Sequence, residues 1–440
     1  MIRRKRLVAL LIITAFTFFG NAQKSNVKRI AKRYPGLKND ILHTKPDYIV
    51  YVPQEERNQR GDTYNDHFHV FYGVSGVLFA MWTQASDEGH LDQHVVFSKS
   101  YDEGMTWEHP IVIAGSETVL NRREISSWQI PMVSEKGRIY VLWNQQEYGQ
   151  TGLTGQLCGW MYGRYSDDEG ETWSDAEKIN MPIMDSDKEN PSTPPDWAVW
   201  QKPLRLGKNE KYLVGLTRHA KVGKKKRYRT SVEFIQFNNI DEHPEISELS
   251  ISWFMTNENV LEVPSDYGGA TCEEPSIVKL PDNRLFALLR TGTGYPYWSQ
   301  SIDNGITWMK PKPLLDKDGG KPFLQPISPC PIYDWKGNEA GSGYYYAFLH
   351  NRFDFKAKSA YQNRGPVYLI AGTFQKDAEQ PIWFGEPKIF INRPAENSLY
   401  SSSTVSPDGK NILWYNDKKH YLLGKIIDEK WFEEAPPLHK

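Results

Sequence analysis

The sequence predicts an all-β protein built as a six-bladed β-propeller, with a seven-bladed propeller as the alternative. An octet of the form Ser-x-Asp-x-Gly-x-Thr-Trp occurs three times. Short apolar or aromatic stretches recur between turn signals, and helical periodicity is scarce. Regular short strands that recur every few tens of residues are typical of propellers, in which each blade is a small antiparallel sheet.

The three octets share one pattern and occupy residues 100–107, 166–173 and 301–308. An aspartate can cap its own turn through its carboxylate, and a glycine supplies the positive φ that a tight turn requires. The final tryptophan is expected to hold the turn against the neighbouring sheet. We therefore interpret one residue of each octet as a turn residue rather than a catalytic one: Asp102, Asp168 and Asp303.

Further stretches read as strands of the same propeller. They are apolar or aromatic runs of five to seven residues and cover residues 94–98, 110–114, 138–143, 212–216, 284–290, 344–349 and 411–415. Blades of about 60–70 residues would give six units over residues 61–440.

The start of the chain has the pattern of an export signal. Four basic residues at positions 3–6 precede an apolar run at 7–20, and a small residue, Ala22, stands where a signal peptidase would cut. We expect residues 1–22 to be removed and the protein to be periplasmic or secreted; a membrane anchor is the alternative. Residues 23–60 carry weak strand signals and are expected to lead into the propeller at 61–440.

Charge argues against a nucleic-acid partner. The chain has 53 basic and 54 acidic residues, and removing the four basic residues of the signal leaves 49 against 54, a difference of −5. No basic surplus is therefore left to bind a phosphate backbone. Aromatic residues make up 13% of the chain, which suits both β-structure and sugar-binding sites.

Three scattered cysteines, Cys158, Cys272 and Cys330, share no metal-ligand spacing. One disulfide between two of them and three buried thiols are both compatible with the sequence. We expect no cofactor and no metal site.

The octets and the strand pattern resemble the sialidase-like superfamily of Asp-box, or BNR-repeat, β-propellers. Sialidases bind a carboxylate-bearing sugar with three arginines and use a tyrosine nucleophile that a glutamate activates. Four positions match in the same order: Glu274 and Arg290 at the two ends of residues 274–290, Arg364 before an apolar strand, and Tyr400 at the start of residues 400–409. The resemblance implies that these four residues lie in one site.

Two positions depart from the family pattern. His69, in the stretch 68–71, stands where the first arginine is expected. The loop at 86–92, where the family has an acid/base aspartate, contributes His90. These departures favour β-elimination at a uronic acid over cleavage of sialic acid.

In this interpretation Arg290 and Arg364 bind the substrate carboxylate, which acidifies the proton on C5. Tyr400, favoured as a phenolate by the guanidinium groups, and the histidines at 69 and 90 exchange protons with the substrate. A sugar leaving from C4 would make the enzyme a lyase, and water would make it a dehydratase. The chain resembles the lyases and dehydratases of ulvan degradation, which implies an anionic, uronate-containing saccharide, sulfated or unsulfated, as its partner.

Two other function classes stay open. A retaining exo-glycosidase of the sialidase type would use Tyr400 and Glu274, and a carbohydrate-binding propeller would need no catalytic residue. His67 and His94 are interpreted as ordinary polar residues of strands or loops. Three tryptophans fit a sugar platform or the core equally well: Trp128, Trp197 and Trp200.

Overall fold

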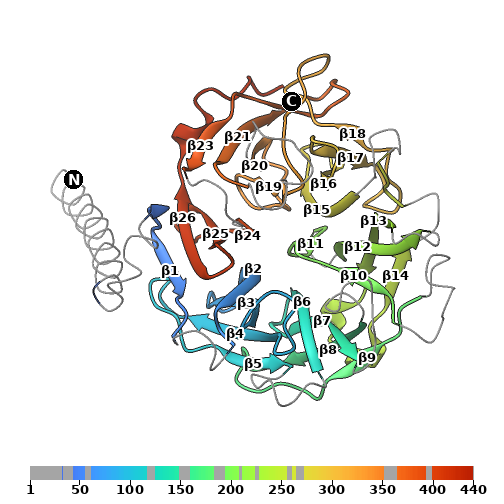
Figure 1. Ribbon diagram of the computed structural model, residues 1–440, viewed down its shortest axis with the longest axis vertical. Coiled ribbons are helices and arrows are strands. Elements are labelled where there is room, and N and C mark those ends of the chain that lie inside the picture. Colours follow the sequence, from blue (N-terminus) through green and yellow to red (C-terminus); the bar gives the residue numbers. More distant parts are fainter. Residues whose placement is uncertain are drawn as a thin grey trace, which may run out of the picture.

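The computed structural model is a ring of six β-sheets arranged around a common axis (Figure 1). It describes residue 32 and residues 43–54, 61–115, 124–147, 159–182, 194–207, 211–222, 227–254, 260–263, 272–350, 364–392 and 399–439. Each sheet has four or five antiparallel strands. The prediction of an all-β propeller is confirmed, and the number of blades is six.

The first three blades follow the chain in order. Blade 1 consists of β2 (Tyr64–Tyr72), β3 (Leu78–Ala85), β4 (His94–Ser100) and β5 (Ile111–Ala114). Blade 2 consists of β6 (Glu124–Val133), β7 (Ile139–Glu147), β8 (Trp160–Ser166) and β9 (Glu177–Ile179). Blade 3 consists of β10 (Asp196–Ala198), β11 (Leu204–Arg205), β12 (Tyr212–Val222), β13 (Arg227–Phe237) and β14 (Ile251–Phe254).

The last three blades complete the ring. Blade 4 consists of β15 (Cys272–Lys279), β16 (Leu285–Thr291), β17 (Tyr297–Ser301) and β18 (Lys312–Pro313). Blade 5 consists of β19 (Ile332–Asp334), β20 (Tyr344–His350), β21 (Val367–Phe374), β22 (Ile382–Phe384) and β23 (Lys388–Ile391). Blade 6 contains β24 (Ser401–Val405), β25 (Asn411–Asp417) and β26 (Tyr421–Ile427). The described residues also include three 3₁₀ turns, η3 (Ile240–Glu242), η4 (Ile246–Glu248) and η6 (Glu429–Phe432).

The ring is closed by a strand from the beginning of the chain. Strand β1 (Tyr48–Tyr51) pairs with β26 and forms the outer edge of blade 6. It lies inside the range 23–60 that we expected to be a lead-in segment, so the propeller includes part of that range. Four apolar residues are too short a signal to identify a strand from sequence alone.

The octets form the turns that the sequence predicts. In the first, the Asp102 carboxylate accepts hydrogen bonds from the backbone N–H of Thr106 at 2.8 Å and from its hydroxyl at 2.6 Å. Gly104 has a φ of +85°, and a Cβ added there would lie 2.6 Å from the ring of Trp414 in blade 6. The turn therefore needs glycine both for its backbone conformation and for close packing against the preceding blade.

Replacing Asp102 by alanine is expected to lower the free energy of unfolding by about 1 kcal/mol and to leave turnover unchanged, because only the turn loses its hydrogen bonds. Urea denaturation of the variant, with Thr106→Val as a partial loss of the same contacts, measures the effect. A variant that keeps its stability and loses turnover would contradict the turn assignment.

In the second octet, the equivalent hydrogen bonds lower the pKa of Asp168 to about 2. The contribution of that turn to the stability of the fold is therefore complete above the ordinary aspartate pKa of 3.8 and is lost as the pH falls towards 2.

Cys272 and Cys330 are free and buried, and Cys158 lies outside the described residues. In the described ranges, His, Cys, Asp and Glu side chains form no group that could hold a metal ion. The same ranges contain no helix with the length and apolar character needed to cross a membrane. The predicted signal at residues 1–22 lies outside the described part of the chain.

Candidate active site at the starts of the inner strands

The inner strands of three blades are bulged near their first residues. The pairing register shifts between Asp66 and His69 in β2, and comparable shifts occur in β6 and β15. A non-glycine residue with a positive φ lies in each bulge: His67 at 54°, Trp128 at 55° and Glu274 at 49°. A positive φ at a non-glycine residue costs about 1–3 kcal/mol of conformational energy per residue. Such residues concentrate at functional sites, where a bulge redirects a side chain.

Tyr400 lies at the centre of the side chains that these bulges bring together. Its hydroxyl accepts a hydrogen bond from Nη1 of Arg364 at 3.1 Å and another from Nη1 of Arg290 at 3.4 Å. The tyrosine and both arginines are at most 6% exposed. Two positive charges therefore point at one buried hydroxyl oxygen.

Two carboxylates flank Arg290 from the other side. Its Nη1 donates to Oε1 of Glu274, and its Nε lies 3.2 Å from Oε2 of Glu273. Burial disfavours the charged guanidinium, but the two glutamates outweigh this effect and hold the pKa of Arg290 well above its usual value. Within the described residues, Oε2 of Glu274 and Nε of Arg364 have no hydrogen-bond partner. Buried polar atoms are rarely left in that state, so these two atoms are available to a ligand.

His67 is the histidine beside Tyr400. The two rings meet edge-on with their centres 6.3 Å apart, and the His67 ring also packs 5.2 Å from that of Trp128. Nδ1 of His67 lies 3.1 Å from the hydroxyl of Thr83. Burial lowers the pKa of His67 below its usual 6.5, although the carboxylate of Asp66 opposes the shift. The imidazole is therefore neutral near pH 7.

A lysine covers the other side of the tyrosine. Nζ of Lys419 lies 4.8 Å from the ring centre of Tyr400, 3.0 Å from Oδ2 of Asp66 and 2.7 Å from Oε1 of Glu88. Burial disfavours its charge, but Asp66, Tyr400 and Glu88 raise the pKa of Lys419 above its usual value. The lysine is therefore a third positive charge beside the tyrosine, over its ring.

The structure brings four of the six sequence-predicted residues together: Glu274, Arg290, Arg364 and Tyr400. His69 is fully buried, and neither of its ring nitrogens has a hydrogen-bond partner in the described ranges. His90 has a 42% exposed side chain whose Nδ1 lies 2.6 Å from Oδ1 of Asp92. The loop that carries His90 contributes Glu88 to the site instead.

His67, which the sequence reading treated as an ordinary polar strand residue, lies in the site. Regular alternation along a strand places positions 67 and 69 on the same face. The register shift between Asp66 and His69 breaks that alternation, so the two histidines separate. His94 fits its predicted role, because it is buried and its Nδ1 lies 2.7 Å from the backbone oxygen of Asp92.

The tryptophans divide between the site and the core. Trp200 meets the Tyr400 ring edge-on at 5.5 Å, and Trp128 packs against His67. Trp197 is fully buried, and its Nε1 donates to the backbone oxygen of Gly159 at 2.8 Å. The sequence left Trp200 open between a sugar platform and the core, and Lys419 belongs to no sequence motif, so only the three-dimensional arrangement identifies Lys419 as a site residue.

Comparison with known proteins gives a family and a set of similar folds. A sequence model described as "BNR repeat-like domain" matches residues 76–412. No curated protein sequence matches the chain. The intramolecular trans-sialidase from Ruminococcus gnavus, solved with oseltamivir carboxylate, superposes with a TM-score of 0.57 at 14% identity, over 88% of this chain and 98% of that one.

Two further solved structures show the same fold. The NanB sialidase from Streptococcus pneumoniae gives a TM-score of 0.59 at 12% identity, over 87% of this chain and 71% of that one. A protein of unknown function from Dyadobacter fermentans gives 0.56 at 13% identity, over 86% of this chain and 96% of that one. At such identities the likeness establishes the six-bladed fold and leaves the chemistry to the residues of the site.

Proposed function

The chain belongs to the BNR repeat-like domain family, and from that premise we propose that it is a carbohydrate-active enzyme that performs β-elimination at a uronic acid. The substrate is an anionic oligo- or polysaccharide of the ulvan type. The product carries a double bond between C4 and C5 of the uronate.

The observation that carries the proposal is the set of contacts at the Tyr400 hydroxyl. Two guanidinium groups donate to it, and no carboxylate of the described residues makes a hydrogen bond with it. Glu274, the counterpart of the glutamate that activates the tyrosine in sialidases, is bound to Arg290 instead. Charge that develops on the phenolic oxygen as its proton leaves is stabilised by both arginines. This arrangement suits a tyrosine that gives up its proton, and no carboxylate of the described residues makes the hydrogen bond that would activate it as a nucleophile.

The two proton transfers are assigned to His67 and Tyr400. Arg364, whose Nε is unpartnered among the described residues, binds the substrate carboxylate and stabilises the charge that grows on it. Neutral His67 takes the proton from C5, and the electrons of that C–H bond form the C4–C5 double bond. The C4–O bond breaks as Tyr400 protonates the departing oxygen.

The pH profile of kcat/KM is expected to have an acidic limb that lies below pH 6.5. His67 acts only when it is neutral, and its pKa is lowered from 6.5, so activity is kept until the pH falls below that value. The profile of the wild type is compared with that of His67→Gln, and the exposed His109→Gln serves as control. An unchanged limb in His67→Gln would remove this histidine from the chemistry.

One assay separates the candidate functions. Purified protein is incubated with uronate oligosaccharides, and ultraviolet absorbance and new reducing ends are followed together. Absorbance with new reducing ends indicates a lyase, and absorbance alone indicates a dehydratase. Reducing ends without absorbance indicate hydrolysis and would overturn elimination, and neither signal would leave a carbohydrate-binding protein.

Sialidase-type hydrolysis is the second candidate function. It is favoured by the order and clustering of Glu274, Arg290, Arg364 and Tyr400. A covalent glycosyl adduct on Tyr400, trapped with a fluorinated sugar and detected by peptide mass spectrometry, would select it. An enzyme that performs elimination gives no such adduct.

A polysaccharide substrate fits an enzyme that works outside the cytoplasm, and residues 1–22 have the pattern of an export signal. We expect the protein from the periplasm or medium to begin at Gln23. Mass spectrometry of the N-terminal peptide checks this, and a peptide that begins at Met1 would contradict it.

A further inference from the structure

A cavity of about 470 Å³ lies between blades 1 and 2, outside the candidate active site. Residues 112–115, at the end of β5, form one wall of this cavity. Strands β7 and β8 contribute Trp143, Gln145, Tyr162 and Arg164 to the opposite wall. Ligand pockets commonly measure about 300–1,000 Å³, so the space is large enough for a small molecule or one unit of a polymer.

The cavity reaches the end of the propeller at which Tyr400 lies. In blade 1, the pairing register leads from Ala114 across β4 and β3 to Asp66, where the bulge of β2 begins. In blade 2, Gln145 pairs with Ser126, just before the bulge of β6. Strand β8 is two strands further out than β6, and neighbouring strands lie about 4.8 Å apart, so the cavity is roughly 10 Å outward from that bulge. A chain that extends outward from Tyr400 between blades 1 and 2 therefore passes over it.

One wall of the cavity is aromatic. The rings of Trp143 and Tyr162 are stacked, with an interplanar angle of 26° and their centres 6.5 Å apart. Trp143 is buried, whereas Tyr162 is half-buried, so the accessible part of this wall belongs to the tyrosine. Flat rings of this kind present a large apolar surface with little freedom to move, which suits the C–H face of a pyranose.

Gln145 supplies a hydrogen-bond donor beside the rings. Its Oε1 accepts a hydrogen bond from Nε1 of Trp143 at 3.1 Å, which identifies the oxygen of the amide and holds it against the wall. Its Nε2 makes no hydrogen bond with the described residues, and the side chain is half-buried in the lining. The two N–H groups of this nitrogen can therefore donate to the oxygen atoms of a sugar.

The charge of the lining admits an anionic sugar. Among the described residues that line the cavity, Arg164 is the charged one, and no aspartate or glutamate occurs. Cζ of Arg164 lies 5.9 Å from the ring centre of Trp143, on the same wall as the aromatic pair. A carboxylate or sulfate that enters the cavity therefore meets no like charge from this lining.

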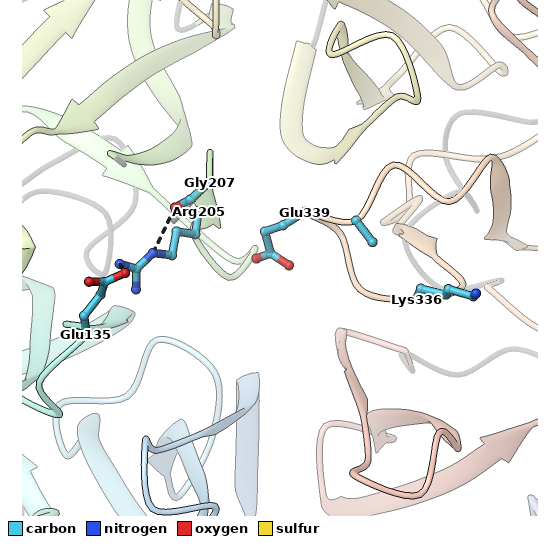
Figure 2. A pocket seen from close by; sticks show the side chains of 6 residues that line it. Glu135, Arg205, Gly207, Lys336 and Glu339 are labelled. Carbon is cyan, nitrogen blue, oxygen red and sulfur yellow. Dashed lines mark hydrogen bonds and ion pairs between the residues drawn. The ribbon is translucent and has the colours of Figure 1, made fainter. Parts of the chain in front are cut away.

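A second pocket, of about 540 Å³, is less suited to such a chain. Its lining comes from several blades (Figure 2), through β11 and the turns that follow β6 and β19, so it lies at the opposite end of these strands from Tyr400. Glu135 and Glu339 line it beside Arg205 and Lys336, and its described lining contains no aromatic side chain. Carboxylates repel an anionic saccharide, and no ring is present there for it to pack on.

We propose that the cavity between blades 1 and 2 is a secondary saccharide subsite, which binds a pyranose unit of the same anionic chain whose uronate reacts at Tyr400. The identity of this chain rests on the proposed function. The sugar ring packs on Tyr162, and Nε2 of Gln145 donates to its oxygen atoms. Two contacts along one chain raise the overall affinity, so the subsite favours long substrates and takes no part in bond breaking.

Affinity electrophoresis in gels that contain ulvan tests the subsite, with Tyr400→Phe as the background so that the polymer is not consumed. Gln145→Glu keeps the oxygen that accepts from Trp143, removes the donor and adds a like charge. We expect it to weaken ulvan binding about 3- to 10-fold, the usual worth of one hydrogen bond. Gln300→Glu is the matched control, because the Gln300 oxygen also accepts a hydrogen bond, from Nη1 of Arg284 at 2.9 Å, and lies in blade 4.

Steady-state kinetics without the Tyr400 change provide the second measurement. Gln145→Glu is expected to raise KM for ulvan and to leave kcat, and KM for the shortest oligosaccharide that is cleaved, unchanged. Undiminished ulvan binding in Gln145→Glu, or an equal loss in Gln300→Glu, would overturn the subsite even where elimination is observed. If no elimination occurs but Gln145→Glu alone weakens ulvan binding, the proposed function fails and the subsite stands.

A variant that does not fold leaves the subsite testable. If Gln145→Glu is unstable, Tyr162→Leu, which removes the ring on which the sugar packs, takes its place in both measurements. Crystals of the Tyr400→Phe protein soaked with ulvan oligosaccharides are expected to show a sugar ring against Tyr162. A cavity that stays empty while sugar is bound at position 400 refutes the subsite.

Discussion

Replacing Tyr400 by phenylalanine is expected to lower kcat by about 10²- to 10⁴-fold, because proton transfer by a positioned group contributes that much to rate. The phenol is the group that protonates the departing oxygen, and phenylalanine keeps the ring that packs against Trp200 and His67. KM is expected to change little, since the substrate carboxylate is bound by arginine. Steady-state kinetics that follow the unsaturated product measure both quantities.

Tyr333→Phe is the matched control for this variant. Tyr333 is also a buried tyrosine of an inner strand, but its hydroxyl contacts Ser401, at 2.6 Å from the backbone oxygen and 2.9 Å from the side chain, rather than the arginines of the site. Removing that hydroxyl costs about 1 kcal/mol of stability and no turnover. Full activity in Tyr400→Phe would exclude the proposed elimination site. An equal loss of kcat in Tyr400→Phe and Tyr333→Phe would indicate an effect on packing.

Replacing Arg290 by methionine is expected to lower the free energy of unfolding by about 3–5 kcal/mol, the usual cost of removing one partner from a buried ion pair. Glu273 and Glu274 would then lie in the middle of the protein without their cation. The double variant Arg290→Met/Glu274→Gln should recover part of the loss, because one of the two uncompensated charges is removed.

Urea denaturation of the two single variants and the double variant measures this coupling. Additive losses, with no recovery in the double variant, would show that the Arg290–Glu274 contact does not carry the expected energy. Both variants that lack Arg290 are also expected to show a higher KM, because one of the two guanidinium groups of the site is missing.

Local turn chemistry made the fold predictable. Each octet specifies its own hairpin through contacts within eight residues, so the turn around Asp102 can be identified without knowing its neighbours. Arg290, Arg364 and Tyr400 could be found because they follow the order of a known family. Three octets mark only three of the six blades, so the number of blades depended on strands that no motif labels.

The proton-transfer residue was harder to predict for a physical reason. A strand pattern assumes regular alternation, and the bulge after Asp66 breaks it, so His67 rather than His69 lies beside the tyrosine. Lys419 comes from a turn about 350 residues further along the chain, and its distance from Asp66 depends on how blades 6 and 1 meet. Contacts of this kind, between distant segments, cannot be recognised from any local sequence pattern.

Closure of the ring by β1 has a consequence for the order of folding. This strand leaves the ribosome before any blade has been made, and its partner β26 is among the last segments to follow. The pairing of Ile49 with Leu423 therefore joins two segments from near opposite ends of the described chain. Contacts of such long range form slowly, because the intervening chain must be brought together first. Until synthesis ends, blade 6 lacks its outer strand and β1 has no partner, so an incomplete chain exposes a free sheet edge that a chaperone or protease can recognise.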